Sequence, residues 1–298
     1  LEGVPTPFDA LEFDEILGTC DVLYDLAFLL MDLRHIGLHR AANITLNSYL
    51  MQAQSADHYV ALSLLPLFLS VRAAIRAMVG VQTAQVNPDD ATLLPEARAY
   101  LADALDYLAP KPAQLIAVGG LSGTGKTVLA AALAPLIGAA PGAVHLRSDL
   151  ERKALFNVSP LTPLPPSAYG SGVSAQVYDI LRNKARDALS GGHSVILDAT
   201  WLSKADRATL PALAADASAR FSGLWLSAET GVLEARVAAR RGDASDADVA
   251  VVRQQASQTQ ASQTQAPTSW AQVDAAGSPA ATLSNARACL SAQPGPAA

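Results

Sequence analysis

The chain has 298 residues, half of them apolar, with 27 acidic and 21 basic residues and a formal net charge of −6. This length predicts two domains. The net acidic charge argues against a duplex-binding protein, and two distant cysteines, Cys20 and Cys289, exclude a disulfide framework or a cysteine metal site. We therefore expect a reduced, cytoplasmic protein.

The first part of the chain, residues 1–108, is predicted to be a mostly α-helical lobe. Its apolar residues follow helical spacing from Asp21 onward, with breaks at Gly37, Gly80 and 86–90. The chain opens on Leu1 with a segment typical of a strand and turn inside a fold, so we expect a fragment of a longer protein.

The most apolar stretch of the chain, residues 59–71, belongs to this lobe. It holds a proline, ends at Arg72 and is shorter than a bilayer-spanning helix needs, so we expect a buried helix and no membrane partner.

A proline-bearing linker, 109–113, separates the helical lobe from a second part, 114–255, in which predicted strands and helices alternate. Such alternation predicts an α/β three-layer sandwich with a parallel sheet. Residues 256–298 are expected to be a polar repeat and a partly disordered tail. They contain ASQTQ twice in tandem, either as an extended polar helix or as a duplicated linker.

A glycine-rich segment follows the first strand of the second part. Residues 119–127, GGLSGTGKT, have the spacing G-x-x-x-x-G-K-[ST] between a strand-like run and a helix-forming run. Its backbone N–H groups and the following helix N-terminus are suited to phosphate. Lys126 is expected to reach the β- and γ-phosphates and to act in catalysis, and Thr127 to bind Mg²⁺. The predicted nucleotide-binding residues are Gly120, Ser122, Gly123, Thr124, Gly125, Lys126 and Thr127.

The next predicted strand ends in SDLERK, which places an acid and an arginine at the carboxyl end of a parallel strand. Ligands bind at that edge of such sheets. Asp149 is a candidate for the catalytic base that accepts the proton of an attacking hydroxyl, and Arg152 for a contact to a phosphate or an acidic substrate group. The alternative for Asp149 is a helix N-cap.

The third strand leads into ILDATWLSKADR, residues 196–207. Asp198 is a candidate Mg²⁺ residue, with a strand-end turn as the alternative. Thr200 and Arg207 are candidate substrate contacts, although a solvated helix face explains Arg207 equally well.

An arginine-bearing helix near the end of the second part has the pattern of a lid. Arg236, Arg240 and Arg241 lie nearly on one helical face, and Gly242 ends the helix. Such a lid neutralises the charge that develops during phosphoryl transfer and excludes water. We assign Arg236 and Arg240 to nucleotide binding and Arg240 also to catalysis; a solvated charged helix is the alternative.

These four elements in this order resemble the small P-loop kinases, a group that includes gluconate-kinase-like enzymes, polynucleotide 5′-kinases and zeta-toxin-type kinases. The resemblance covers about 113–255 and implies ATP and Mg²⁺ as cofactors. It leaves the acceptor unidentified.

The segment PFDALEFDEILGTCDVLYDLAFLLMDL, residues 7–33, is similar to the end of an aminoglycoside-phosphotransferase-like core. The resemblance matches Asp9 to that family's metal-binding aspartate, but its H-G-D-x-x-x-x-N loop is not in this chain. We interpret Asp9, Glu12 and Asp14 as a non-catalytic remnant. The whole chain thus resembles a truncated bacterial two-part protein of the kind often labelled an AAA family ATPase.

The predicted function is ATP-dependent phosphoryl transfer to a hydroxyl of a small molecule. A nucleic-acid 5′-hydroxyl kinase is a second possibility, but it predicts a basic groove with stacking aromatics, whereas 112–298 carries a net charge of only +2 and few aromatics. A third is a nucleotide-binding or ATPase regulatory module, although VILDAT has a single acid where an Asp-Glu pair is expected. The oligomeric state is not indicated.

Overall fold

The computed structural model describes residues 21–53, 55–261 and 267–292, so the predictions for Asp9, Glu12 and Asp14 lie outside the described residues. The N-terminal part is helical, as predicted. Gly37, at φ +80°, makes the turn after the first described helix, and 87–92 make the turn between the last two helices of this part. The helices are α2 (Val22–His35), α3 (His39–Ala53), α4 (Ala56–Ala61), α5 (Leu65–Val86) and α6 (Leu93–Leu108), with a single 3₁₀ turn, Leu62–Leu64, before α5.

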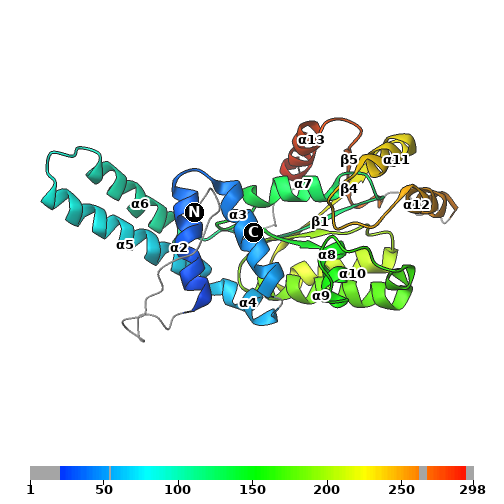
Figure 1. Ribbon diagram of the computed structural model, residues 1–298, viewed down its shortest axis with the longest axis horizontal. Coiled ribbons are helices and arrows are strands. Elements are labelled where there is room, and N and C mark those ends of the chain that lie inside the picture. Colours follow the sequence, from blue (N-terminus) through cyan, green and yellow to red (C-terminus); the bar gives the residue numbers. More distant parts are fainter. Residues whose placement is uncertain (1–20, 54, 262–266, 293–298) are drawn as a thin grey trace.

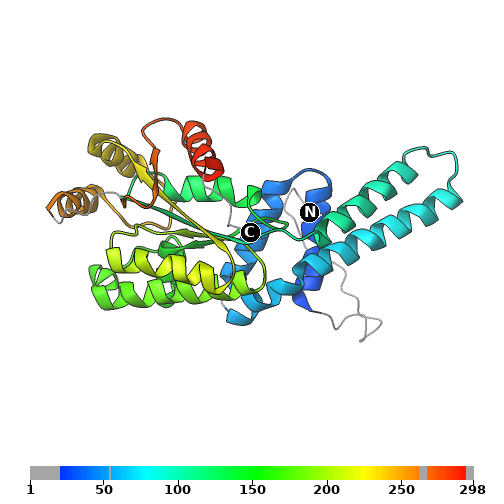
Figure 2. The ribbon, with the colours of Figure 1, turned by 180° about the vertical axis from the view of Figure 1, so that it is seen from behind.

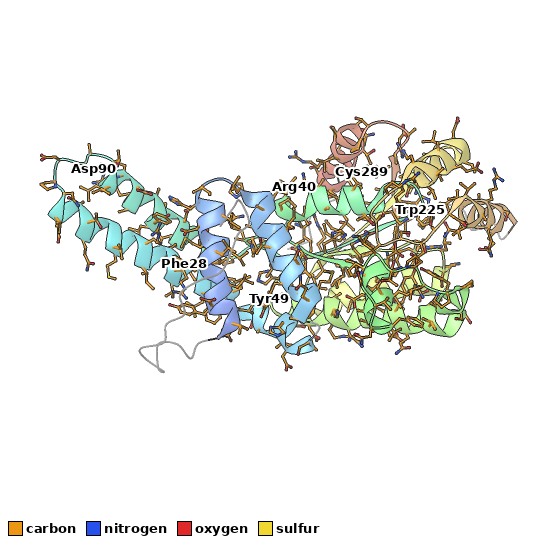
Figure 3. All side chains as sticks on the ribbon, viewed as in Figure 1. Phe28, Arg40, Tyr49, Asp90, Trp225 and Cys289 are labelled. Carbon is orange, nitrogen blue, oxygen red and sulfur yellow. The ribbon has the colours of Figure 1, made fainter. Side chains whose placement is uncertain are left out.

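The predicted break at Gly80 is wrong, because Gly80 lies inside α5. A Cβ built at this position would lie 3.0 Å from the Cβ of Ala97 on α6. The glycine therefore permits the close approach of α5 and α6, which form a hairpin that projects away from the sheet (Figure 1). Asp90 lies near the tip of this hairpin (Figure 3).

The apolar stretch at 59–71 is part of a longer helical run, Ala56–Val86, than the sequence predicts. Its most apolar window is only 28% buried, and Leu67 and Met78 are 48% and 54% exposed, so the expectation of a buried helix holds for one face only. Among the described residues this run alone is long and apolar enough to cross a membrane, a test that core helices of soluble proteins also pass.

The second part is built on a five-stranded parallel sheet in the order β2-β3-β1-β4-β5. Parallel strands present their carboxyl ends at one edge, and the glycine-rich segment follows the central strand. The strands are β1 (Gln114–Gly120), β2 (Val144–Arg147), β3 (Val195–Asp198), β4 (Arg220–Ser227) and β5 (Ala271–Asp274).

Helices cover both faces of the sheet and complete the predicted three layers (Figures 1 and 2). Ile116 and Val118 of β1 belong to the core beneath α7 (Lys126–Leu133) and α13 (Pro279–Ala292), whereas Leu115 and Ala117 belong to the opposite core. The opposite layer contains α8 (Ser148–Leu155), α9 (Ser171–Ser190) and α10 (Lys204–Asp216), and α11 (Thr230–Ala239) and α12 (Val249–Ala261) follow β4. The α/β fold class is confirmed.

The prediction of a polar repeat and partly disordered tail at 256–298 is wrong for the described residues after the repeat. There β5 extends the sheet, and α13 buries Ala286 and Leu290 against it. Trp270 is 4% exposed and leads into β5, and a Cβ at Gly223 of β4 would lie 2.3 Å from its ring. The first ASQTQ copy continues α12, while 262–266 and 293–298 lie outside the described residues.

The N-terminal helices join the second part along β2, one of the two edge strands of the sheet. The amide of Asn43 on α3 donates to the carbonyl of Ala143 at 3.0 Å, and the side-chain oxygen of Asn47 accepts from the backbone N–H of His145 at 2.7 Å. These asparagines satisfy backbone groups that an edge strand leaves unpaired. Leucines of α3 and α5 also share one core with α9.

Candidate functional site

The glycine-rich segment forms a loop between β1 and α7, in the strand-loop-helix order that the sequence predicts. Gly120 has φ +136° and Gly123 has φ +87°, values that favour glycine. A Cβ at Gly123 would also lie 2.7 Å from the carbonyl oxygen of Leu233 on α11. Side chains at these positions would strain the loop, which explains why the segment needs glycine.

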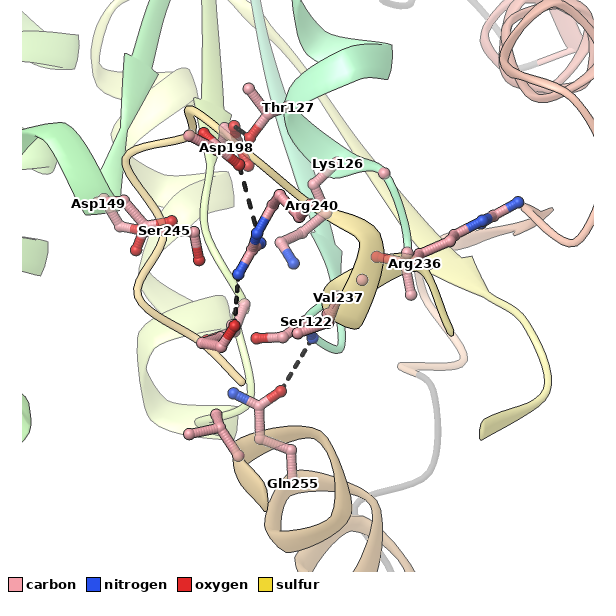
Figure 4. Close-up of a pocket in the computed structure, with 18 of the residues that line it drawn as sticks. Ser122, Lys126, Thr127, Asp149, Asp198, Arg236, Val237, Arg240, Ser245 and Gln255 are labelled. Atoms are coloured by element: carbon pink, nitrogen blue, oxygen red, sulfur yellow. Dashed lines mark hydrogen bonds and ion pairs between the residues drawn. The ribbon is translucent and has the colours of Figure 1, made fainter. Parts of the chain in front are cut away.

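A cavity of about 810 Å³ opens beside this loop and gathers most of the predicted residues, from α7, α8, β3, α11 and the loops next to them (Figure 4). Its volume is within the range of small-molecule sites. Gly120 and Arg207 are not in its wall. The predicted residues that line it are Ser122, Gly123, Thr124, Gly125, Lys126, Thr127, Asp149, Arg152, Asp198, Thr200, Arg236 and Arg240.

Lys126 lies in this cavity with its Nζ donating to the carbonyl of Leu121 at 2.9 Å. Burial lowers the pKa of Lys126, and the nearby carboxylates of Asp198 and Asp149 oppose that shift. The amino group of Lys126 is therefore held by the loop itself.

Thr127 and Asp198 meet at the base of the cavity, where the threonine hydroxyl donates to Asp198 Oδ2 at 2.6 Å. Burial opposes ionisation of Asp198, but the hydrogen bond and charge of His145, aided by Lys126 and Thr127, hold the pKa of the carboxyl below its usual value. A hydroxyl beside one ionised carboxylate suits Mg²⁺, which takes few protein oxygens and completes its coordination with water and phosphate. The predicted metal residues therefore fit the ion.

Asp149 lies in the first turn of α8, directly after β2, and its side chain forms part of the cavity wall. Burial, followed by the charge of Asp198, raises the pKa of its carboxyl. The N-cap of α8 is Arg147 and makes no side-chain capping bond, so the alternative capping role of Asp149 is not observed. Asp149 instead presents a half-buried carboxyl group to the cavity.

Two of the predicted acceptor-side residues, Arg152 and Thr200, line the same cavity as Asp149. Arg152 is 7% exposed, donates to the carbonyl of Ala168 at 2.6 Å and lies over the ring of Tyr169 at 4.8 Å. Its Nε–H is buried and has no hydrogen-bond partner among the described residues. Thr200 is within 3.3 Å of the hydroxyl of Tyr178, which sequence reasoning did not assign to the site.

The structure contradicts the prediction that Arg207 faces the acceptor. Arg207 lies on α10 and is only 9% exposed. Its guanidinium donates to the carbonyls of Trp201 at 2.6 Å and Leu202 at 2.8 Å. This cation ties together the turn after β3, so its role in the fold is to pair buried backbone oxygens.

The lid arginines separate into three environments. Arg240 lines the cavity, donates to the carbonyl of Ala247 and lies 3.7 Å from Asp243. Arg236 also borders the cavity but points away from Lys126, toward the β5–α13 loop (Figure 4), where it donates to Ala275 at 2.7 Å. Arg241 bonds carbonyls of its own helix end and lies outside the cavity. The expected common face of the three is not formed, because α11 ends at Ala239.

Sequence reasoning also missed His145 and Gln255. His145 of β2 places Nε2 3.3 Å from Asp198 Oδ2. Gln255 of α12 accepts a hydrogen bond from the backbone N–H of Ser122, in the glycine-rich loop, at 2.9 Å. A single histidine in a strand belongs to no spaced motif that would have indicated its role. Gln255 lies at the start of the repeat, for which the sequence left both an extended polar helix and a duplicated linker open.

The glycine-rich loop after the central strand, and the helix that follows it, form a P-loop on a parallel α/β sheet. Residues 115–262 match the family model AAA_33, an AAA domain. The match begins in β1 and ends just after α12, so it contains every predicted site residue.

The chain is also similar to longer curated proteins. It is 34% identical over 264 residues to Uncharacterized protein Rv2004c of Mycobacterium tuberculosis (strain H37Rv) and, with the same figures, to Uncharacterized protein Mb2027c of Mycobacterium bovis. Each alignment covers 87% of this chain and 51% of the relative. The chain thus spans about half the length of these relatives.

Two solved structures overlap the P-loop part. A gluconokinase from Sinorhizobium meliloti 1021 covers 61% of this chain and 94% of its own, with a TM-score of 0.41 and 19% identity. The Deinococcus radiodurans tunicamycin resistance protein covers 60% and 94%, with a TM-score of 0.40 and 21% identity.

Proposed function

We propose that the chain transfers the γ-phosphoryl group of ATP–Mg²⁺ to a hydroxyl of a small molecule. The observation that carries this proposal is the position of Asp149, a half-buried carboxyl group in the wall of the cavity that also contains Lys126. A water-using NTPase needs no carboxylate beyond the metal shell on the acceptor side, whereas a kinase needs one within reach of the acceptor hydroxyl.

Each part of the site has a role in this reaction. The loop N–H groups and Lys126 hold the β- and γ-phosphates, and Thr127 and Asp198 would hold Mg²⁺, which neutralises phosphate charge when bound. Arg240 adds a cation at the cavity wall, where charge develops during transfer. Asp149 accepts the proton of the acceptor hydroxyl, and the partnerless Nε–H of Arg152 suits an acceptor that carries further oxygens.

The aromatic residues support a small acceptor over a nucleic-acid strand. Trp201, Trp225 and Trp270 are all at most 4% exposed and pack edge-to-face against one another inside the fold. They do not offer the exposed stacking surfaces that single-stranded nucleic acid uses.

The test is a transfer screen with γ-labelled ATP against sugars, nucleosides, aminoglycosides and 5′-hydroxyl oligonucleotides. We expect label in one small-molecule class, and a Lys126→Ala variant with ATP affinity reduced about tenfold to a hundredfold, because a charge-assisted hydrogen bond contributes about 1.5–3 kcal/mol. Label released only as inorganic phosphate would instead favour an ATPase module, and unchanged ATP affinity in Lys126→Ala would contradict the nucleotide site.

A further inference from the structure

The loop between α11 and α12, residues 240–248, is held over the cavity by two aspartates. Asp243 accepts a hydrogen bond from Arg147 of β2 at 2.7 Å. Asp246 accepts from the side chains of Lys153 and Tyr169 and from the backbone N–H of Leu164 at 3.0 Å. This loop, the lid loop, is therefore tied to the acceptor side of the site at two points.

Ser245 lies between these two anchors, so its position in the cavity wall is fixed from both sides. Its side chain lies next to the carboxyl of Asp149 in the wall of the cavity (Figure 4). The hydroxyl of Ser245 is therefore beside the group that the proposed function makes the base.

Three other hydroxyls in the same cavity wall are engaged away from Asp149. Thr127 donates to Asp198, Thr124 donates to the carbonyl of Leu121 at 2.8 Å, and Tyr169 donates to Asp246. Ser245, in contrast, places an alcohol group beside the candidate base (Figure 4).

We propose that Ser245 is an autophosphorylation site, at which the chain transfers the γ-phosphoryl group of ATP to its own lid loop. This inference rests on the proposed function. The Ser245 Oγ forms a bond to the γ-phosphorus as the bond from that phosphorus to the β–γ bridging oxygen breaks, and ADP leaves. The hydroxyl proton passes to the carboxylate of Asp149. Because the lid loop belongs to the chain that holds the nucleotide, the transfer is intramolecular.

The experiment incubates the full chain with ATP and Mg²⁺, without any added acceptor, and locates phosphate by peptide mass spectrometry. We expect a single phosphate on Ser245, formed at a first-order rate that does not change with protein concentration. Ser245→Ala abolishes it, whereas Ser245→Thr restores it as phosphothreonine at the same position. Asp149→Asn slows it by about 10²–10⁴, the usual contribution of a general base. Ser190→Ala, an exposed serine at the end of α9, is the matched control and keeps wild-type labelling.

ATP binding and ADP release are measured on the same samples, which separates the two claims. A chain that binds ATP and phosphorylates an added acceptor, but carries no phosphate on Ser245, contradicts the inference and leaves the proposed function intact. Phosphate on another residue, or a rate that rises in proportion to protein concentration, also contradicts it. A chain that does not bind ATP refutes both.

Discussion

The side-chain oxygen of Asn47 accepts a hydrogen bond from the backbone N–H of His145 at 2.7 Å, which connects the N-terminal helices to the strand that carries a partner of Asp198. Asn47 also donates to Asn43 Oδ1 at 3.2 Å and to the carbonyl of Ala143 at 3.3 Å. A side chain with this many backbone bonds at a sheet edge stabilises the junction of the two parts.

We predict that Asn47→Ala lowers the free energy of unfolding by about 1–3 kcal/mol, because it leaves backbone groups of β2 without partners. Urea unfolding measures this change. Asn183→Ala, an exposed substitution on α9, is the control and shifts stability by less than about 0.5 kcal/mol. Equal stability of the two variants would show that the amides of α3 contribute nothing to the junction.

Arg207 is predicted to matter for stability and not for substrate binding. Arg207→Ala leaves the carbonyls of Trp201 and Leu202 without their donor, at a cost of about 1–3 kcal/mol. A lower melting temperature with an unchanged KM for the acceptor is expected. A raised KM for the acceptor at unchanged stability would instead support the sequence-based prediction that Arg207 contacts the acceptor.

The strand and helix order from 114 to 241 could be read from the sequence, because each element has a clear period and a glycine or proline boundary. The loop 119–127 carries its chemistry in its spacing, so Lys126 and Thr127 could be placed without coordinates. Asp149 and Asp198 could be placed because parallel strands end at one edge.

Residues whose role depends on tertiary contacts could not be predicted in the same way. Nothing in the sequence distinguishes Arg207 and Arg236 from Arg240. In the structure, each of the three donates to backbone carbonyls of a different loop. Residues 270–292 resemble a linker in composition, and their place in the fold depends on Trp270 reaching the space above Gly223. Neither the partners of these arginines nor the packing of Trp270 can be recognised from a local sequence pattern.

Two neighbouring arginines allow a matched test of the lid. Arg240→Ala removes the cation in the cavity wall and should reduce turnover, while Arg241→Ala, which removes bonds to the helix end only, should leave turnover near wild type. Both side chains are outside the core, so both variants should unfold within a few degrees of wild type. Equal turnover of the two variants would mean that the lid acts without the charge of Arg240.

Stability should fall at acid pH because of His193, which is fully buried. Burial lowers the pKa of His193 from 6.5 to about 4, so below pH 6.5 the unfolded chain takes up a proton that the folded chain excludes. The loss continues until the folded form titrates near pH 4 and reaches roughly 3 kcal/mol. His193→Leu should flatten this part of the profile, and His39→Gln, an exposed substitution, should not. Parallel profiles for wild type and His193→Leu would contradict the assignment.

The central claim is that Asp149 is the base of a phosphoryl transfer. The substitution Asp149→Asn keeps the shape of the side chain and removes the base, so turnover with an accepted substrate should fall by about 10²–10⁴. Affinity for ATP should change little, because the phosphates are held by the loop and Lys126. The most direct measurement therefore compares Asp149→Asn with wild type in two properties, turnover and affinity for ATP. We predict lost turnover with retained affinity, whereas near-normal turnover would contradict the account and favour a nucleotide-binding module.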